Sequence, residues 1–214
     1  GYPSRHLGPT ERRAFVVGNS FFKQNWVQAP ASAVGRDGLG PFFDARSCSA
    51  CHFKDGRGRP PVGPERHPTG LLLKLNVPGP GGVHQPHPVY GGQLQPRAIG
   101  GLEPEARFEL RYEVIDGAYP DGATYQLHRP VYRVTDARFG PVGEDTVISP
   151  RVGSQIIGMG LLEAVPVEVL ECSADAEDAD GDGISGRIHW VEDEHGKRAP
   201  GRFAWKAEAA TVKQ

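Results

Sequence analysis

The stretch that decides the reading of this chain is RSCSACHFKDGRGRPP, residues 46–61, which holds two of its three cysteines. Cys48 and Cys51 enclose two small residues, and His52 follows directly. A CxxC pair commonly serves as a thiol redox couple, as half of a zinc site, or, when histidine comes next, as the attachment point of haem c. The rest of the sequence discriminates among these three uses.

Haem attachment explains every position of this motif. A zinc site needs two further soft ligands, and the sequence holds neither a second CxxC nor a HxxxH. A thioredoxin-type couple lies beside a βαβ unit, for which the flanking sequence shows no pattern. Two thiols one helical turn apart match the two vinyl groups at one porphyrin edge, and the next imidazole then reaches the iron. We expect one covalent haem c on Cys48 and Cys51, with His52 as the proximal iron ligand.

The composition is that of a loop-rich globular chain. Glycine and proline supply 29 and 20 of the 214 residues, close to the share of about 25–30% at which unpatterned chains tend towards disorder. Such a chain benefits from a bulky bound group that completes its core, since three cysteines allow one disulfide at most. A net charge of −2 and the lack of an apolar run of about 18 residues argue against nucleic acid, an anionic membrane surface or a membrane span.

Apolar periodicity predicts helices on both sides of a β-rich middle. Thr10 is a candidate N-cap for a helix over 11–27, and Ser149-Pro150 precedes a predicted helix over 151–164. Strict alternation in RFELRYEV predicts a strand with an antiparallel neighbour. The predicted strands are 69–77, 107–114 and 123–134.

These elements predict an α+β fold in a single haem domain over 1–214. Its cytochrome c-like helical core covers about 10–67 and 148–214, and an antiparallel β-rich insertion covers about 68–147.

Four blocks of sequence together resemble one known family. The blocks are FVVGNSFFKQNWVQAP (15–30), DGLGPFFDARSCSACHFKDGRGRPP (37–61), GAYPDGATYQLHRPVY (117–132), and ISPRVGSQIIGMGLLEAVP with DADGDGISGR (148–166 and 178–187). In this order they resemble the bacterial di-haem oxidoreductases, which are regarded as peroxidases or thiol oxidoreductases and are distant relatives of the di-haem cytochrome c peroxidases. Family members continue into a second cytochrome c-like half with its own CxxCH, whereas this sequence ends at EAATVKQ. We therefore expect the chain to be the N-terminal haem half.

The predicted 151–164 helix carries the candidate residues for the distal side of the haem. Gln155, Met159 and Glu163 are spaced by four and share one face of that helix. Met159, the only methionine, is a possible distal iron ligand, with core packing as the alternative. By resemblance to the related peroxidases, Gln155 and Glu163 are candidate catalytic residues, Glu163 as a proton shuttle. A solvated carboxylate is the alternative for Glu163.

Other side chains are candidates for holding the haem or its iron. One of Arg46, Arg57 and Arg59 is expected to pair with a haem propionate, and Trp26 to pack on the porphyrin. The remaining histidines are surface residues or distal ligands; they are His6, His67, His84, His87, His128, His189 and His195.

The acidic loop is a possible calcium site. Asp178, Asp180 and Asp182 occupy positions 1, 3 and 5 of a calcium-loop pattern, and Ile184 offers a carbonyl at position 7. Position 12 is histidine instead of glutamate, so a solvated acidic turn is the alternative. Cys172 is expected either to pair with a cysteine outside this sequence or to be buried and inert.

Three classes of function follow. The first is a peroxidase-like haem c oxidoreductase that uses a small peroxide and exchanges electrons with a C-terminal haem domain or another redox protein. The second is a purely electron-transferring c-type cytochrome with a His/Met-ligated haem, and the third is a thiol protein without haem. Because haem c is attached outside the cytoplasm, we expect an exported, periplasmic protein.

Overall fold

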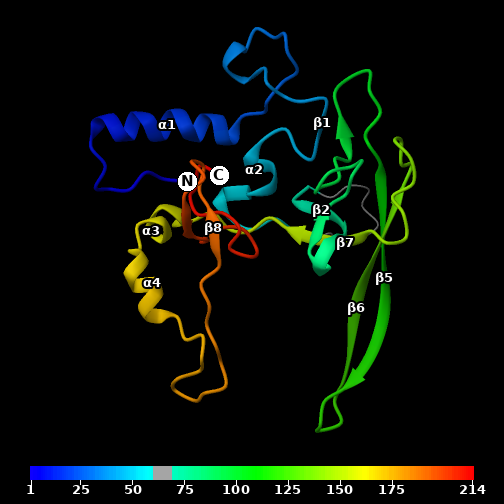
Figure 1. The fold of residues 1–214 in the computed structure, drawn as a ribbon. Coiled ribbons are helices and arrows are strands. Elements are labelled where there is room, and N and C mark those ends of the chain that lie inside the picture. Colours follow the sequence, from blue (N-terminus) through cyan, green and yellow to red (C-terminus); the bar gives the residue numbers. More distant parts are fainter. Residues whose placement is uncertain (60–68) are drawn as a thin grey trace. The chain divides into compact units, whose positions relative to one another are not determined.

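The computed structural model describes residues 1–59 and 69–214, which form two compact units, Gly1–Gln155 and Ile156–Gln214. Figure 1 shows the chain as a ribbon with many of its elements labelled, and each unit is described here by itself. Among the described residues, no helix is both long and apolar enough to cross a lipid bilayer. His67, a candidate iron ligand, lies outside the described residues.

The first unit opens with helix α1, Pro9–Lys23. It begins two residues earlier than predicted, because Gly8 is the N-cap and its N–H donates to the Glu11 carboxylate at 2.5 Å. It also ends earlier, since Gln24 is extended and the Trp26 N–H bonds the Arg46 carbonyl at 2.7 Å. The predicted extension to residue 27 is therefore wrong, and Trp26 lies beyond the helix.

The centre of the first unit is a three-stranded antiparallel sheet. Strand β2, Leu71–Pro78, lies between β3, His84–Pro86, and β7, Val147–Val152. A short pair joins β1, Phe42–Phe43, to β4, Arg97–Ala98.

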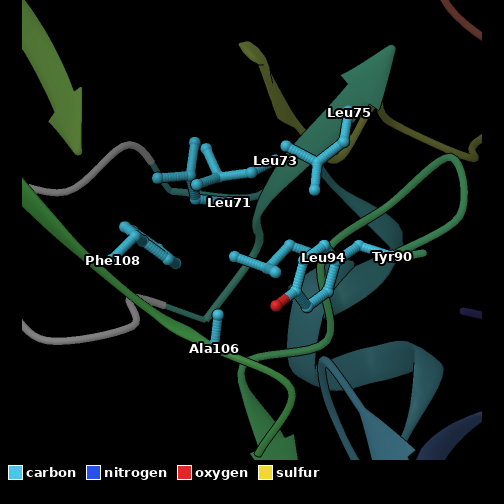
Figure 2. Close-up of a cluster of buried hydrophobic side chains, with 7 residues drawn as sticks. All are labelled: Leu71, Leu73, Leu75, Tyr90, Leu94, Ala106 and Phe108. Atoms are coloured by element: carbon cyan, nitrogen blue, oxygen red, sulfur yellow. The ribbon is translucent and has the colours of Figure 1, made fainter. Parts of the chain in front are cut away.

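The core of this unit gathers on one face of β2. Leu71, Leu73 and Leu75 alternate along that strand and are almost fully buried. Figure 2 shows them together with buried side chains from the segments before and after β4 and from the start of β5, namely Tyr90, Leu94, Ala106 and Phe108. Burying an aliphatic side chain of this size contributes about 1.5–3 kcal/mol each, so this cluster anchors the sheet that carries the site.

A long two-stranded ribbon leaves this core. Strand β5, Arg107–Ala118, pairs antiparallel with β6, Thr124–Thr135, and Figure 1 shows the ribbon extending well past the sheet. Only its base is buried, at Phe108 and Leu110. The three predicted strands are thus confirmed: the second is longer than predicted, ending at Ala118, and the other two differ from their predicted bounds by one or two residues.

The predicted helix over 151–164 is wrong. Residues up to Val152 form β7, which pairs with β2 in the register Leu73 with Pro150. Proline is tolerated there because β7 is an edge strand and needs no N–H on its outer side. Loop residues follow, with Gly158 in the left-handed region at φ 77°, and the helix is reduced to α3, Met159–Glu163.

The second unit consists of short elements. After α3 comes α4, Val167–Ser173. An acidic loop follows, closed by mutual backbone hydrogen bonds between Asp175 and Gly186 at 2.9 and 2.7 Å. Strands β8, Trp190–Glu192, and β9, Arg198–Pro200, then form a hairpin. The mixed helices and antiparallel sheets agree with the predicted α+β class; the cytochrome c-like core and the single domain over 1–214 stay predictions.

Candidate functional site

The CxxCH motif forms one isolated helical turn. Helix α2, Cys48–Cys51, follows the buried Ser47, and the His52 N–H donates to the Cys48 carbonyl at 2.9 Å. Cys48 is exposed and Cys51 partly buried. The Ser49 hydroxyl donates to the Lys23 carbonyl at 3.2 Å, which fixes this turn to the C-terminal end of α1.

The imidazole of His52 is oriented by a residue far away in the sequence. Its Nδ1 lies 2.7 Å from the backbone carbonyl oxygen of Ser154, just after β7. Because a carbonyl oxygen only accepts, Nδ1 must carry a proton, and in the neutral imidazole Nε2 is then the nitrogen with the lone pair. A histidine that ligates a metal typically makes this contact with its other nitrogen, since the contact fixes both tautomer and ring direction.

Three glycines allow the backbone to pack closely behind the motif. The Gly58 N–H donates to the Gly153 carbonyl at 2.8 Å, and the Gly153 N–H to the Gly70 carbonyl at 3.0 Å. A Cβ at Gly153 would lie 3.2 Å from Cε1 of His52, and one at Gly58 would lie 2.8 Å from the Gly70 oxygen. Gly70 also has φ 93°, a conformation that favours glycine. Side chains at these positions would push the His52 ring and its loop out of place.

Cys51 lies in a partly buried environment. Burial raises the pKa of its thiol above the ordinary value, and a hydrogen bond from the Gly70 backbone offsets this only in part. The protonated thiol of Cys51 is therefore favoured in the chain without a bound metal or haem. Addition of a thiol across a vinyl group proceeds without an oxidant, since S–C and C–H bonds form while the S–H bond and the π bond break.

Apolar side chains near the motif are not covered by the rest of this unit. Helix α1 has no buried residue, and Val16, Val17 and Phe21 are 64, 56 and 40% exposed. On the same helix, the ring centroid of Phe22 lies 6.5 Å from that of His52. Two thiols, an oriented imidazole and an uncovered apolar helix surface are what a covalently bound haem requires.

Comparison with known families gives the chain its identity. The sequence matches, over residues 1–73 and 94–214, the family described as "Di-haem oxidoreductase, putative peroxidase". The chain belongs to the di-haem oxidoreductase family. No curated protein and no solved structure matches it. The resemblance found in the sequence is thereby confirmed, and the haem of this oxidoreductase family agrees with the use of the CxxCH motif given above.

The distal candidates of this di-haem oxidoreductase do not share a helix face. Gln155 lies in the loop after β7 and is exposed, whereas Met159 begins α3 and is partly buried. Glu163 ends α3, is exposed, and accepts a hydrogen bond from the Val212 N–H at 2.9 Å. The argument that these three residues share one helix face was therefore wrong, because the helix covers only Met159–Glu163. The distal roles of these three residues stay predictions.

The side chains expected around the porphyrin are partly engaged with neighbouring rings. The Arg46 guanidinium lies 5.8 Å from the Phe43 ring centroid, and that of Arg59 lies 5.6 Å from Phe53. Arg57 is exposed, and Trp26 is partly buried with its ring centroid 6.0 Å from that of Phe21. Pairing with a propionate and packing on the porphyrin stay predictions.

Among the other histidines, His87 is excluded as an iron ligand. It is buried, its Nε2 donates to the Val142 carbonyl at 2.9 Å, and its Nδ1 accepts the N–H groups of Val89 and Tyr90 at 3.1 Å each. Both nitrogens are therefore used in holding the loop after β3.

The acidic loop brings three carboxylates together, but not the three predicted. Oxygens of Asp175, Asp178 and Asp180 lie within 4.8 Å of one another. Asp182 instead accepts the Ile184 N–H at 2.7 Å within its own turn. Cys172 is a free, exposed thiol on α4, so the expectation that it is buried and inert is wrong.

Sequence reasoning missed Asp44, a partly buried carboxyl group four residues before the motif. The Gln93 amide donates to it, and Arg97 donates to its backbone carbonyl. Burial raises its pKa from 3.8 to about 6, while Gln93, Arg97 and Lys74 oppose the rise and Glu105 adds to it. The sequence held no sign of this buried carboxyl group, since a single aspartate after two phenylalanines matches no known motif.

Replacing this group, Asp44→Asn, should stabilise the protein at neutral pH. The native state holds the Asp44 proton more tightly than the unfolded chain, so the free energy of unfolding falls as pH rises from about 4 to 6 and stays lower above. The raised pKa of Asp44 lowers the free energy of unfolding at neutral pH by about 3 kcal/mol. Asparagine carries no charge and so avoids this loss, while its side-chain oxygen can still accept the hydrogen bond from the Gln93 amide. Denaturant unfolding between pH 4 and 7 measures this. Asp116→Asn, an exposed aspartate that also accepts from a glutamine, should leave the profile unchanged. A pH profile unaltered by Asp44→Asn would contradict the assignment.

Proposed function

We propose that this di-haem oxidoreductase chain binds one haem c through Cys48 and Cys51, with His52 as the iron ligand, and works as a peroxidase-like oxidoreductase domain. The observation that carries the proposal is the 2.7 Å contact between Nδ1 of His52 and the Ser154 carbonyl, which leaves Nε2 free to ligate. When bound, haem supplies a one-electron redox centre. The chain's own residues tether it, direct the imidazole and hold the proton on Nδ1.

Electron exchange requires a partner that accepts or donates single electrons. Since the family is di-haem, we propose that the partner is a C-terminal haem domain or another redox protein, with this chain as the N-terminal haem half. Because haem c is attached outside the cytoplasm, we propose that the protein is exported to the periplasm. The exposed apolar side chains of α1 support a surface that is covered in the assembled protein or by haem.

A purely electron-transferring cytochrome is the second candidate function, and Met159 favours it. Its thioether is the only one in the chain and is partly buried at the start of α3. Ligation by Met159 would fill the sixth coordination position and leave no site for peroxide.

The test is expression with export and c-type cytochrome maturation. The proposal expects haem absorbance that survives denaturation and organic extraction, and a high-spin ferric spectrum. A low-spin spectrum that Met159→Ala converts to high spin would favour the electron-transfer function instead. Extraction of all haem would contradict covalent attachment and hence both candidates.

We propose calcium as a second cofactor, bound in the loop 175–186. Three carboxylates within 4.8 Å of one another, in a loop closed by the Asp175–Gly186 hydrogen bonds, support this. Calorimetry on the chelator-treated chain should then show binding at about 10⁻⁴–10⁻³ M, the range of extracellular calcium modules. Asp178→Asn should weaken it by about tenfold or more. Asp193→Asn, in the β8–β9 turn, is the matched control; equal effects of both variants, or no heat at all, would refute the site.

A further inference from the structure

A cluster of polar side chains lies directly before the CxxCH turn. Asp44 follows β1, and its carboxylate accepts a hydrogen bond from the Gln93 amide, while Arg97 of β4 donates to its backbone carbonyl. Lys74 of β2 forms an antiparallel bridge with Gln93, which brings this lysine close to the same carboxyl group. Glu105, just before β5, also acts electrostatically on it. Segments far apart in the sequence thus converge on Asp44.

This cluster acts on the cysteine that precedes the proposed iron ligand. Burial is the main cause of the raised pKa of the Cys51 thiol, and the Asp44 carboxylate adds to the rise while Arg97 opposes it. A charge on Asp44 is therefore felt at the point where the proposed haem is tethered. Because the interaction between two sites is reciprocal, a charge gained or lost at that point is also felt by Asp44.

Asp44 can change its protonation state without a rearrangement of its surroundings. Burial raises its pKa from 3.8 to about 6, although Gln93, Arg97 and Lys74 lower it, and Glu105 adds to the rise. An amide N–H can donate to an oxygen of the carboxylate or of the carboxylic acid, so the hydrogen bond from Gln93 is available to both forms. Proton uptake and release at this group therefore leave the cluster intact.

We propose that Asp44 is the proton-exchanging group of the haem site, taking up one proton when the site gains an electron and releasing it when the electron leaves. This inference rests on the haem attachment proposed above. The electron comes from the redox partner proposed there and returns to it, and the proton comes from water, so one positive charge balances each added negative charge. In the protein, the O–H bond of the Asp44 carboxyl group is the only bond that this exchange makes or breaks.

The reduction potential of the haem-bearing chain between about pH 4 and 8, followed by the absorption spectrum, tests the proposal. The potential should fall as pH rises, because the carboxylate that forms disfavours the added electron. If the reduced site binds the Asp44 proton about tenfold more tightly than the oxidised site, the total fall is about 59 mV. Asp44→Asn should abolish this fall, whereas Asp116→Asn, an exposed aspartate that also accepts from a glutamine, should keep it. A fall of full size in Asp44→Asn would overturn the proposal.

Two neighbouring charges test the cluster in opposite directions. Glu105 raises the pKa of Asp44 and Lys74 lowers it. Glu105→Gln should therefore move the midpoint of the change in potential to lower pH, and Lys74→Gln should move it to higher pH, while the size of the change stays the same. Midpoints that do not move in either variant would overturn the assignment to Asp44.

Failure of this inference is distinguishable from failure of the proposed function. A chain without covalent haem contradicts both, and the mass of the denatured protein shows this before any potential is measured. A haem-bearing chain with a potential that is constant over this pH range contradicts the role of Asp44 alone. The pH dependence of unfolding needs no haem: a profile that Asp44→Asn leaves unaltered would also overturn the proposal.

Discussion

Double replacement of the motif cysteines, Cys48→Ser with Cys51→Ser, is expected to remove all covalently bound haem from the purified chain. Serine keeps the size of the side chain but its hydroxyl does not form the thioether. Each single variant should retain one link, so that haem resists extraction with a shifted absorbance. Mass spectrometry of the denatured protein gives the result directly, as the mass of the chain with or without one haem.

The third cysteine provides the control. Cys172→Ser removes an exposed thiol of the other unit and should leave haem content unchanged. Haem lost from the Cys172 variant, or kept covalently by the double variant, would contradict the assignment of the motif.

Replacement of Glu163 by glutamine is expected to slow the reaction with peroxide by about 10²- to 10⁴-fold, if this carboxyl group moves the proton to the leaving oxygen. The variant should fold normally, because the glutamine carbonyl oxygen can accept the Val212 N–H that Glu163 Oε1 accepts now. Rapid-mixing kinetics with hydrogen peroxide, together with the resting absorption spectrum, measure the rate and show that the haem environment is unaltered.

Glu168→Gln is the matched change on the neighbouring helix α4, where the carboxylate is also exposed. It should leave the rate unchanged. Equal slowing by both variants would indicate a general charge effect, and no slowing by Glu163→Gln would remove Glu163 from the mechanism.

The sequence predicted those parts of the fold that depend on local patterns. Alternation in 107–114 predicted β5 because one face of its base is buried at Phe108 and Leu110. The CxxCH motif predicted a helical turn at Cys48–Cys51, because such a turn depends only on residues next to each other in the chain. The family was predicted from the same local blocks and is confirmed by the comparison.

The sequence failed where long-range contacts decide the structure. The sequence predicts a helix from residue 151, with Ser149-Pro150 as its start pattern. Pairing with the buried leucines of β2 instead makes residues 147–152 a strand. The contact of His52 with Ser154 could not be foreseen for the same reason. Asp44 was missed because its pKa depends on burial by segments distant in sequence.

The hydrogen bond between His52 and Ser154 joins positions 102 apart in the chain. Contacts of such long sequence separation form late, because a large loop must close before they are gained. The imidazole therefore acquires its final direction only when β7 has paired with β2, while the two cysteines are already adjacent in the newly made polypeptide. Under the proposed haem attachment, the cysteines would be loaded before folding is complete, and a late change in the spectrum of the iron would report the docking of this sheet during refolding.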